Sequence, residues 1–517
     1  MRIKILALLV SILTLSGLCS MVEQDTFSRY AERNVSLIMG ALFSTKAEEA
    51  SFLEYANSNV IMTDLTIESH KLSEDEALNG EYLWDNTDQV YIQTSDASET
   101  VFGSYISRDS IKRILFLNTL ESIPDSAWDV SAFSDKSVMA WIIPNGIMYD
   151  LYIAGNGGVT ANKNCQMMFK NYSNVEEIEF NDCFNTLYVE SMDWMFSGCS
   201  KLKNLDLQSF NTRNVSSMVC MFQDCTELES INFGGNWNSS SVLDMEFMFW
   251  GCESLSQLSL NKYDTSNVQN MTCMFGHCKS LKLLDLKGFE TKNVNNMAGM
   301  FLNCNSLERI SMDGFDTSSV TNMEEMFALC SSLTSLNLCS FDTKNVASFE
   351  NMFLECTSME TLELGEFDTS SAISLYQMFC GCENLKKIDV TGFDTTNVVN
   401  MAAMFANCHS VHEIAIEGFD TSRVNNMHGM FAACYELIEL DLSSFDTSCV
   451  DDMGEMFLGC SSLQHLDISS FDTSNVTNMN RMFYLCSSII ELDIEVLDYS
   501  NVINTEEMFY GCANLGL

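Results

Sequence analysis

A phenylalanine recurs at a fixed interval through the last two thirds of the chain. Methionine precedes each of the fourteen, and cysteine follows three residues later in every unit except the first, which has Tyr172. The interval is 26 residues from Phe249 onward, and only two earlier intervals are 27. A period this regular predicts stacked units that bury their apolar faces against one another. The recurring residues are Phe169, Phe196, Phe222, Phe249, Phe275, Phe301, Phe327, Phe353, Phe379, Phe405, Phe431, Phe457, Phe483 and Phe509.

The spacing inside one unit predicts its local structure. Val476, Met479, Met482, Phe483 and Cys486 lie at offsets 0, 3, 6, 7 and 10, which is typical of one apolar face of a helix about three turns long. The Asp-Thr-Ser-Asn sequence before them supplies side-chain oxygens for a helix N-cap. The Leu-x-x-Leu-x-Leu pattern after them predicts a short half-buried strand.

Stacking of such units determines the fold class. Parallel strands lie about 4.8 Å apart and packed helices about 8 to 10 Å, so the array should curve with its strands on the concave side. We predict an α/β fold, namely a curved leucine-rich-repeat-like solenoid of about 13 to 14 units. Each unit has one strand and one short helix, and a small α+β region precedes the array.

Four parts of the chain follow from this pattern. Residues 1–20 form a signal peptide, and residues 127–167 form the N-terminal cap of the solenoid. Residues 21–126 lack the repeat; they are expected to be α+β, with a helix around 26–55, and their role is unknown. Residues 168–517 form the solenoid, whose last repeat we expect to be incomplete.

The last repeat stops at Gly516-Leu517, before the strand residues that it should supply. An uncovered end exposes an apolar edge, which repeat arrays normally cover with a polar unit. Three explanations stay open: the chain is a fragment, the end stacks on a partner or on itself, or the last unit frays. Self-association through this end is therefore one expected interaction.

The first residues have the order of a secretory signal. Arg2 and Lys4 precede an apolar run at 5–15 that is too short to cross a bilayer, and small residues follow. Cys19 suggests a lipoprotein, but Leu18 departs from the lipobox pattern, so we prefer cleavage near Cys19 without lipidation. No later run is apolar enough to span a membrane. We expect an extracellular protein, secreted or at the cell surface, without a transmembrane segment in the mature chain.

The charge is strongly negative. Lysine and arginine total 26 against 71 aspartates and glutamates, so the formal net charge is −45. A field of this sign repels phosphate backbones and anionic lipids, which argues against nucleic acid as a partner. Cations, basic protein surfaces and neutral glycans stay open as partners, and so does a role in solubility alone.

An aspartate column accompanies the repeat, next to the aromatic residue that opens most units. Calcium takes six to eight oxygen ligands, and this column with its adjacent threonines is a low-probability calcium site. We prefer the interpretation that these side chains accept from backbone N–H groups in turns, and we expect no other cofactor. The column comprises Asp264, Asp316, Asp342, Asp368, Asp394, Asp420, Asp446, Asp472 and Asp498.

The thirteen in-register cysteines are predicted to be buried free thiols. Disulfides between neighbouring units are an alternative, but stacked side chains point the same way and thirteen is an odd number. The close pair Cys220 and Cys225 has no matching second pair, as a zinc site would require, and the same is true of Cys273 with Cys278. We therefore predict no metal site and leave the disulfide state open.

The repeat Phe-Asp-Thr-Ser-x-Val-x-x-Met-x-x-Met-Phe-x-x-Cys resembles the 26-residue bacterial repeat class of the BspA family of leucine-rich-repeat surface proteins. The resemblance covers about residues 127–517, because segments 128–131, 138–141 and 149–153 look like the N-terminal cap of that family. It implies a secreted or cell-surface bacterial protein that attaches to host proteins, matrix or other cells, and it implies no reaction. Members often end in wall-sorting signals or wall-binding modules, which this sequence does not show, so surface retention stays open.

The expected function is binding through strand-side positions that vary between units. Our first hypothesis is a non-enzymatic adhesion or interaction protein whose partner is a surface protein, a matrix protein or a glycan on a host or neighbouring cell. The second is a rigid surface spacer or self-stacking assembly unit, and the third is an enzyme in residues 21–126 that the array targets. The candidate binding residues are Lys386, Lys387, His412, Glu413, Gln464, His465 and Glu491.

Overall fold

The structure is a computed structural model that describes residues 92–93, 100–260 and 263–515. The chain divides into two compact units, Met1–Thr87 and Asp88–Leu517, and every described residue belongs to the second. The expected signal peptide, Cys19 and the expected helix around residues 26–55 lie outside the described residues.

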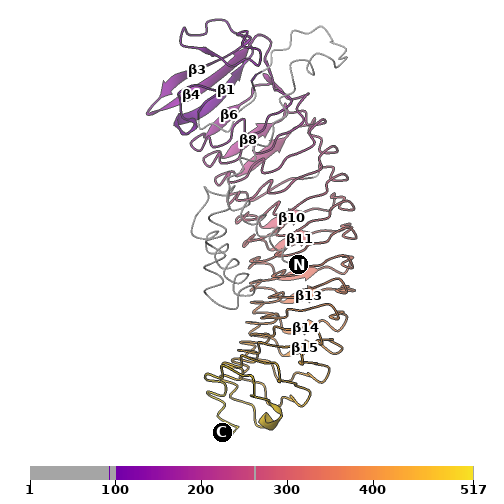
Figure 1. Ribbon diagram of the computed structural model, residues 1–517. Coiled ribbons are helices and arrows are strands. Elements are labelled where there is room, and N and C mark those ends of the chain that lie inside the picture. Colours follow the sequence, from indigo (N-terminus) through magenta and orange to yellow (C-terminus); the bar gives the residue numbers. More distant parts are fainter. Residues whose placement is uncertain (1–91, 94–99, 261–262, 516–517) are drawn as a thin grey trace, which may run out of the picture. The chain divides into compact units, whose positions relative to one another are not determined.

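A five-stranded sheet opens the second unit (Figure 1). Its order is β2-β3-β4-β1-β6; β3 and β4 form an antiparallel hairpin, and β1 pairs in parallel with both β4 and β6. β1 belongs to the region expected before residue 127, so the expected boundary at 126/127 falls inside this sheet. The short helix η1 (Arg108–Ser110) precedes it. The strands are β1 (Ile111–Leu117), β2 (Trp128–Asp129), β3 (Val138–Asn145), β4 (Met148–Gly155) and β6 (Glu177–Glu179).

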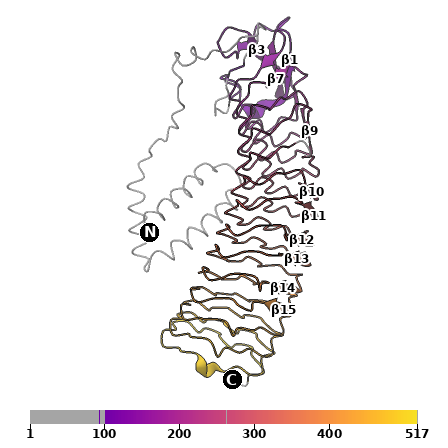
Figure 2. The ribbon, with the colours of Figure 1, turned by 90° about the vertical axis from the view of Figure 1, so that its right-hand side faces the viewer.

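The repeats contribute short strands, and some successive units pair these strands in parallel, residue for residue. Figure 2 shows β9 to β15 following one another along one side of the array. The pairs are β5 with β7, β8 with β9, β10 with β11, β12 with β13 and β14 with β15. The bounds are β5 (Val159–Thr160), β7 (Phe184–Asn185), β8 (Asn204–Leu207), β9 (Ser230–Phe233), β10 (Leu283–Asp285), β11 (Arg309–Ser311), β12 (Ser335–Asn337), β13 (Thr361–Glu363), β14 (Lys387–Asp389), β15 (Glu413–Ala415) and the short helix η2 (Ile494–Val496).

A second line of parallel pairing runs through every unit from Asn164 to Asn504. Each unit contributes one residue, five residues before its recurring phenylalanine, that bridges to its equivalent in the next unit. Neighbouring units therefore pair at this bridge from Asn164 to Asn504, and some of them also pair through their strands.

The prediction of one helix per unit is wrong, because the described residues contain no α-helix. Every second N–H group from Met479 to Leu485 donates to a carbonyl of the next unit, at 2.7 to 2.9 Å. The N–H groups of Met482, Tyr484 and Cys486 close turns onto the carbonyl three residues earlier. A helix would direct all of them four residues back within the unit. The apolar spacing is also satisfied by consecutive turns that bind the neighbouring unit.

Two residues in each of these turn segments have left-handed backbone. In one unit they are Ala403, with φ of 52°, and Asn407, with φ of 58°. The first column holds glycine in two units, Gly299 and Gly429, and side chains with a Cβ atom elsewhere. Left-handed backbone costs a non-glycine residue about 1 to 2 kcal/mol, and that cost explains why such a segment cannot be inferred from helix propensities.

Glycine at this position should stabilise the array. We expect Ala403→Gly to raise the free energy of unfolding by about 0.5 to 1 kcal/mol, because relief of left-handed strain exceeds the entropy that glycine loses on folding. The adjacent Ala402→Gly, where φ is not positive, should lower it by about 1 kcal/mol. Chemical unfolding of both variants checks this, and two equal decreases would contradict the assignment of left-handed backbone.

The core is a continuous column of the fourteen recurring phenylalanines. Successive ring centroids are 5.4 to 5.9 Å apart, from Phe169 to Phe509. The flanking methionines and valines are buried beside them. This column confirms the prediction that the Met-Phe pairs form the core.

The side chain of Arg108 closes the first unit of the stack. Its Nη1 donates to the carbonyls of Met167 at 3.3 Å and Lys170 at 2.8 Å, and its guanidinium lies over the ring of Tyr172. In the next unit the carbonyl of Ser197, which is equivalent to that of Lys170, accepts from the N–H of Asn171 in the preceding unit instead. At the carbonyl of Lys170, Arg108 therefore supplies the donor that a preceding unit would otherwise provide.

Candidate interaction surface

The aspartate column forms turns, as predicted. The Oδ1 atom of Asp446 accepts from the N–H of Ser448 at 3.0 Å, and Asp472 accepts from Ser474 in the same way at 3.0 Å. Hydrogen bonds from the hydroxyl and the N–H group of these serines lower the pKa of both carboxyl groups, so both stay ionised at neutral pH.

A threonine follows each aspartate of the column except Asp498 and connects successive units. The Oγ1 of Thr395 donates to the carbonyl of Asp420 at 2.9 Å and accepts from its N–H at 2.8 Å. The threonines of this column are buried. The helix N-cap that the sequence predicts for this segment does not account for the contact between units. The recurrence of a polar threonine at the same position of successive units is the sequence signal for this contact.

The in-register cysteines are buried, as predicted. Each donates its thiol to the carbonyl of a phenylalanine in the preceding unit, for example Cys434 to Phe405 at 3.2 Å. Burial raises the pKa of Cys434 well above its ordinary value, so the thiol stays protonated. Cysteine recurs at this position because the site is buried and needs a small apolar side chain that can donate one weak hydrogen bond. Outside the column, Cys339 and Cys449 are exposed.

The seven predicted binding residues are all exposed on the strand side. The structure brings four of them together. Lys387 and Glu413 are partners in the pairing of β14 with β15, and their Nζ and Oε1 atoms are 2.7 Å apart. Lys386 and His412 come just before these two strands. His412 also faces Glu436, with Nε2 3.2 Å from Oε2.

The other three candidates lie further along the same side. His465 bridges in parallel to Glu491, and Gln464 precedes His465. The unit between the two groups contributes Ile438 and Glu439, which the sequence analysis did not select. Tyr435 of that unit stacks on His409 with centroids 4.8 Å apart.

Charge on the strand side changes along the array. Each unit has four strand-side positions: the two residues after the apolar residue that follows its turn segment, the residue between its next two apolar residues, and the residue after those. Most are exposed, whereas Ala415 is buried. From Lys282 to Thr391 these positions hold five lysines or arginines and six carboxylates. The contact between Lys287 and Asp313, at 3.3 Å, is an ion pair between two of these units.

The four units that follow are acidic at the equivalent positions. We call these sixteen positions the acidic strand face; they hold eight carboxylates and no lysine or arginine. Variation within single units does not reveal this face. A comparison of the charges at equivalent positions of successive units does reveal it. It comprises His412, Glu413, Ala415, Glu417, Ile438, Glu439, Asp441, Ser443, Gln464, His465, Asp467, Ser469, Ile490, Glu491, Asp493 and Glu495.

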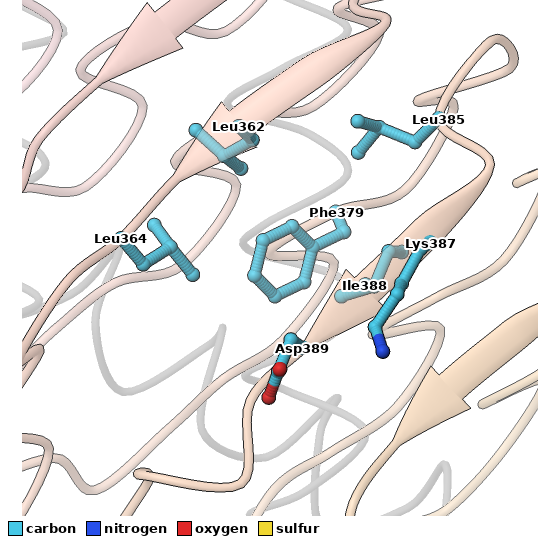
Figure 3. A pocket seen from close by; sticks show the side chains of 7 residues that line it. All are labelled: Leu362, Leu364, Phe379, Leu385, Lys387, Ile388 and Asp389. Atoms are coloured by element: carbon cyan, nitrogen blue, oxygen red, sulfur yellow. The ribbon is translucent and has the colours of Figure 1, made fainter.

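A shallow hollow lies between β13 and β14, two strands that do not pair with each other. Its volume is about 190 Å³ with open space included, below the roughly 300 to 1,000 Å³ of ligand pockets. Figure 3 shows the ring of Phe379 between Leu362 and Leu364 on one side and Ile388 on the other. This hollow suits a surface contact better than an enclosed small molecule.

Carboxylates also gather on the bridge side of the array. Burial, together with the charges of Glu350 and Glu325, raises the pKa of Glu324 to about 7. In the described part of the chain no group of three or more histidine, cysteine or acidic side chains is arranged to hold a metal ion. The same residues include no helix long and apolar enough to cross a membrane.

The raised pKa of Glu324 predicts a pH-dependent stability. The folded state binds this proton more tightly than the unfolded state, so stability is highest below the ordinary glutamate pKa and falls as the pH rises through about 7. We expect the stability of the Glu324→Gln variant to decrease less than that of the wild type between about pH 5 and pH 8. Thermal unfolding across that range measures it, with exposed Glu360→Gln as the control that keeps the wild-type profile. An unchanged slope in Glu324→Gln would contradict the prediction.

These contacts define the chain as a repeat protein whose units pair in parallel with one another. A family described as a Mycoplasma protein of unknown function, DUF285, matches it in overlapping segments that together span residues 163–516. The chain therefore belongs to this family. The matched segments are 163–284, 229–335, 274–362, 334–415 and 410–516.

Other comparisons add little. No curated protein matches the chain. Among solved structures, the crystal structure of a TLR13–ssRNA13 complex matches with 12% sequence identity and a TM-score of 0.14, covering 70% of this chain and 79% of that chain. A likeness at this TM-score carries no argument about fold or ligand.

Proposed function

We propose that this protein is a non-enzymatic interaction protein, exported to the cell surface or the medium, whose repeat array binds a partner on another cell or in the matrix. The observation that carries the proposal is the strand side. It presents exposed residues that differ from unit to unit on a core that repeats with almost no change. Repeat proteins use such extended surfaces for binding. The shallow hollow favours many modest contacts over a deep pocket.

The proposal includes a finer assignment of fold and family. The array is a curved leucine-rich-repeat-like solenoid, because parallel strands lie closer together than the bulkier turn segments on the other side. Its repeat resembles that of the BspA-type surface proteins, in which such an array serves attachment. The N-terminal sequence, with Arg2 and Lys4 before an apolar run, supports export.

The experiment measures binding of the exported full chain to extracellular matrix proteins, surface glycans and whole cells. Saturable binding that an excess of unlabelled chain displaces is the expected result. A matched variant carries Lys387→Ser and His465→Ser on the strand side, and the control carries Thr396→Ala at an exposed position beside the aspartate column. Weaker binding of the first variant alone supports the proposal, whereas absence of binding to every surface contradicts it.

A second candidate function is a stiff surface spacer. The unbroken phenylalanine column and the paired threonines and aspartates favour it, because every unit makes the same contacts with its neighbours. A chain that binds no surface but holds a fused reporter at a fixed distance from the cell would support this function. An enzyme in residues 21–126 stays a prediction that a hydrolase assay of the full chain tests.

A further inference from the structure

The acidic strand face combines a carboxylate excess, which the strand side from Lys282 to Thr391 lacks, with exposed apolar side chains. None of its sixteen positions holds a lysine or arginine. Of its eight carboxylates, Glu413 forms an ion pair with Lys387 of the preceding unit. The face also exposes large apolar side chains: Ile438 is 49% exposed and Ile490 is 50% exposed. Exposed apolar side chains beside charge are typical of contact surfaces between proteins.

The carboxylates of this face are held in place by the backbone. The Oδ1 atoms of Asp441 and Asp467 accept from the N–H groups of Ser443 and Ser469, both at 2.9 Å. These hydrogen bonds lower the pKa of both aspartates. Two ionised groups on successive units are thus fixed before a partner arrives.

The apolar residues form a border along the same units. Ile438 and Ile490 occupy the first strand-side position of units that are two apart, with Gln464 between them. Tyr435, which is 46% exposed and stacked on His409, extends the border toward the preceding turn. The border and the acidic rows run side by side along the stack.

We propose that the acidic strand face docks a cationic protein segment whose lysines or arginines lie along the carboxylate rows and whose aliphatic side chains cover the isoleucine border. Charge complementarity selects this occupant. Nucleic acids and anionic lipids are repelled, and a neutral glycan would leave at least seven carboxylates without a counter-charge. The inference rests on the proposed function and names the class of partner for it.

The probe is a fluorescein-labelled synthetic peptide of alternating lysine and isoleucine, added to the full chain and followed by fluorescence anisotropy. Saturable binding should weaken strongly between about 0.1 M and about 1 M salt, where the screening length falls from about 10 Å to about 3 Å. One matched peptide has glutamate in place of lysine and should not bind. Another has serine in place of isoleucine and should bind more weakly with the same salt dependence.

Paired variants locate the site on the chain. Asp441→Asn with Asp467→Asn keeps the side-chain oxygens that accept from Ser443 and Ser469, so the turns are retained while two charges are lost. We expect the affinity for the lysine–isoleucine peptide to fall about three- to tenfold at low salt and the salt dependence to become shallower. Ile438→Ser with Ile490→Ser should lower the affinity about tenfold without changing the salt dependence.

The control makes the same conservative change where basic residues are present. Asp285→Asn with Asp389→Asn removes two carboxylates that accept from backbone N–H groups in the same way, in units that also carry lysines. Binding should stay at the wild-type level in this variant, and thermal unfolding should be alike in all three.

Each outcome separates this inference from the proposed function. Equal binding of the glutamate peptide, or unchanged binding by the Asp441→Asn and Asp467→Asn variant, overturns the cationic partner. If that variant still binds cells or matrix like the wild type, the proposed function stands without this partner class. If peptide binding behaves as expected but no cell or matrix component is bound, the acidic strand face stands and the adhesive function fails.

Discussion

Phe405→Ala should lower the free energy of unfolding of its part of the array by about 3 to 5 kcal/mol. The ring of Phe405 is fully buried, with centroids 5.7 Å from Phe379 and 5.6 Å from Phe431. Its loss leaves a cavity between two neighbours that the backbone hydrogen bonds hold apart, so the site cannot collapse to fill it.

The measurement must resolve the array unit by unit, because long repeat arrays do not unfold in a single cooperative step. Hydrogen exchange should show faster exchange in the mutated unit and its two neighbours, and unchanged rates in the five-stranded sheet. Phe133→Ala is the control, since that ring is 75% exposed and its removal should change stability by less than about 0.5 kcal/mol. A uniform small effect in Phe405→Ala would show that the column is not the core.

Thr395→Val should cost about 2 to 3 kcal/mol although it keeps the shape of the side chain. The substitution removes the hydroxyl that binds both the N–H and the carbonyl of Asp420, and it leaves these two groups without the partner they have in the wild type. The neighbouring Thr396 is exposed, and its hydroxyl binds only Asp394 of its own unit, at 2.6 Å. Thr396→Val should therefore cost less than about 1 kcal/mol.

Denaturant unfolding compares the two threonine variants directly. The difference between them isolates the contact between units, because both substitutions make the same chemical change. Equal losses would mean that the column stabilises turns within a unit rather than the pairing of one unit with the next.

The period and the identity of the core were predictable from the sequence. A phenylalanine every 26 residues can be buried in every unit only if the units stack, and the structure confirms the buried column. The short strands after the leucines were also predicted, because the alternation of apolar residues there has the period of a strand.

The conformation of the Met-Phe segment was not predictable in this way. Apolar spacing shows which side chains share a side, but it does not show where the N–H groups bind, and from Met479 onward half of them bind the next unit. The left-handed residues Arg481 and Leu485 give no sign of their backbone in their side chains. Contacts between units that are 26 residues apart override local preference here.

The candidate surface was found in part. The seven variable residues are exposed on one side, as variation among units suggested. Ile438, Ile490 and the aspartates at 441, 467 and 493 were missed because three of them recur like structural residues and two are apolar. Only their exposure shows that they belong to the same surface.

The parallel pairing of the units has a consequence for how the number of repeats can change in evolution. Each junction from Asn164 to Asn504 repeats the same bridge, so a duplication or deletion of a whole 26-residue unit recreates contacts that already exist elsewhere in the chain. A deletion of one residue, by contrast, shifts the bridge, the strands and the phenylalanine column together. Unequal recombination between repeats in the gene can therefore lengthen or shorten the array in steps of one unit without requiring a new way to fold.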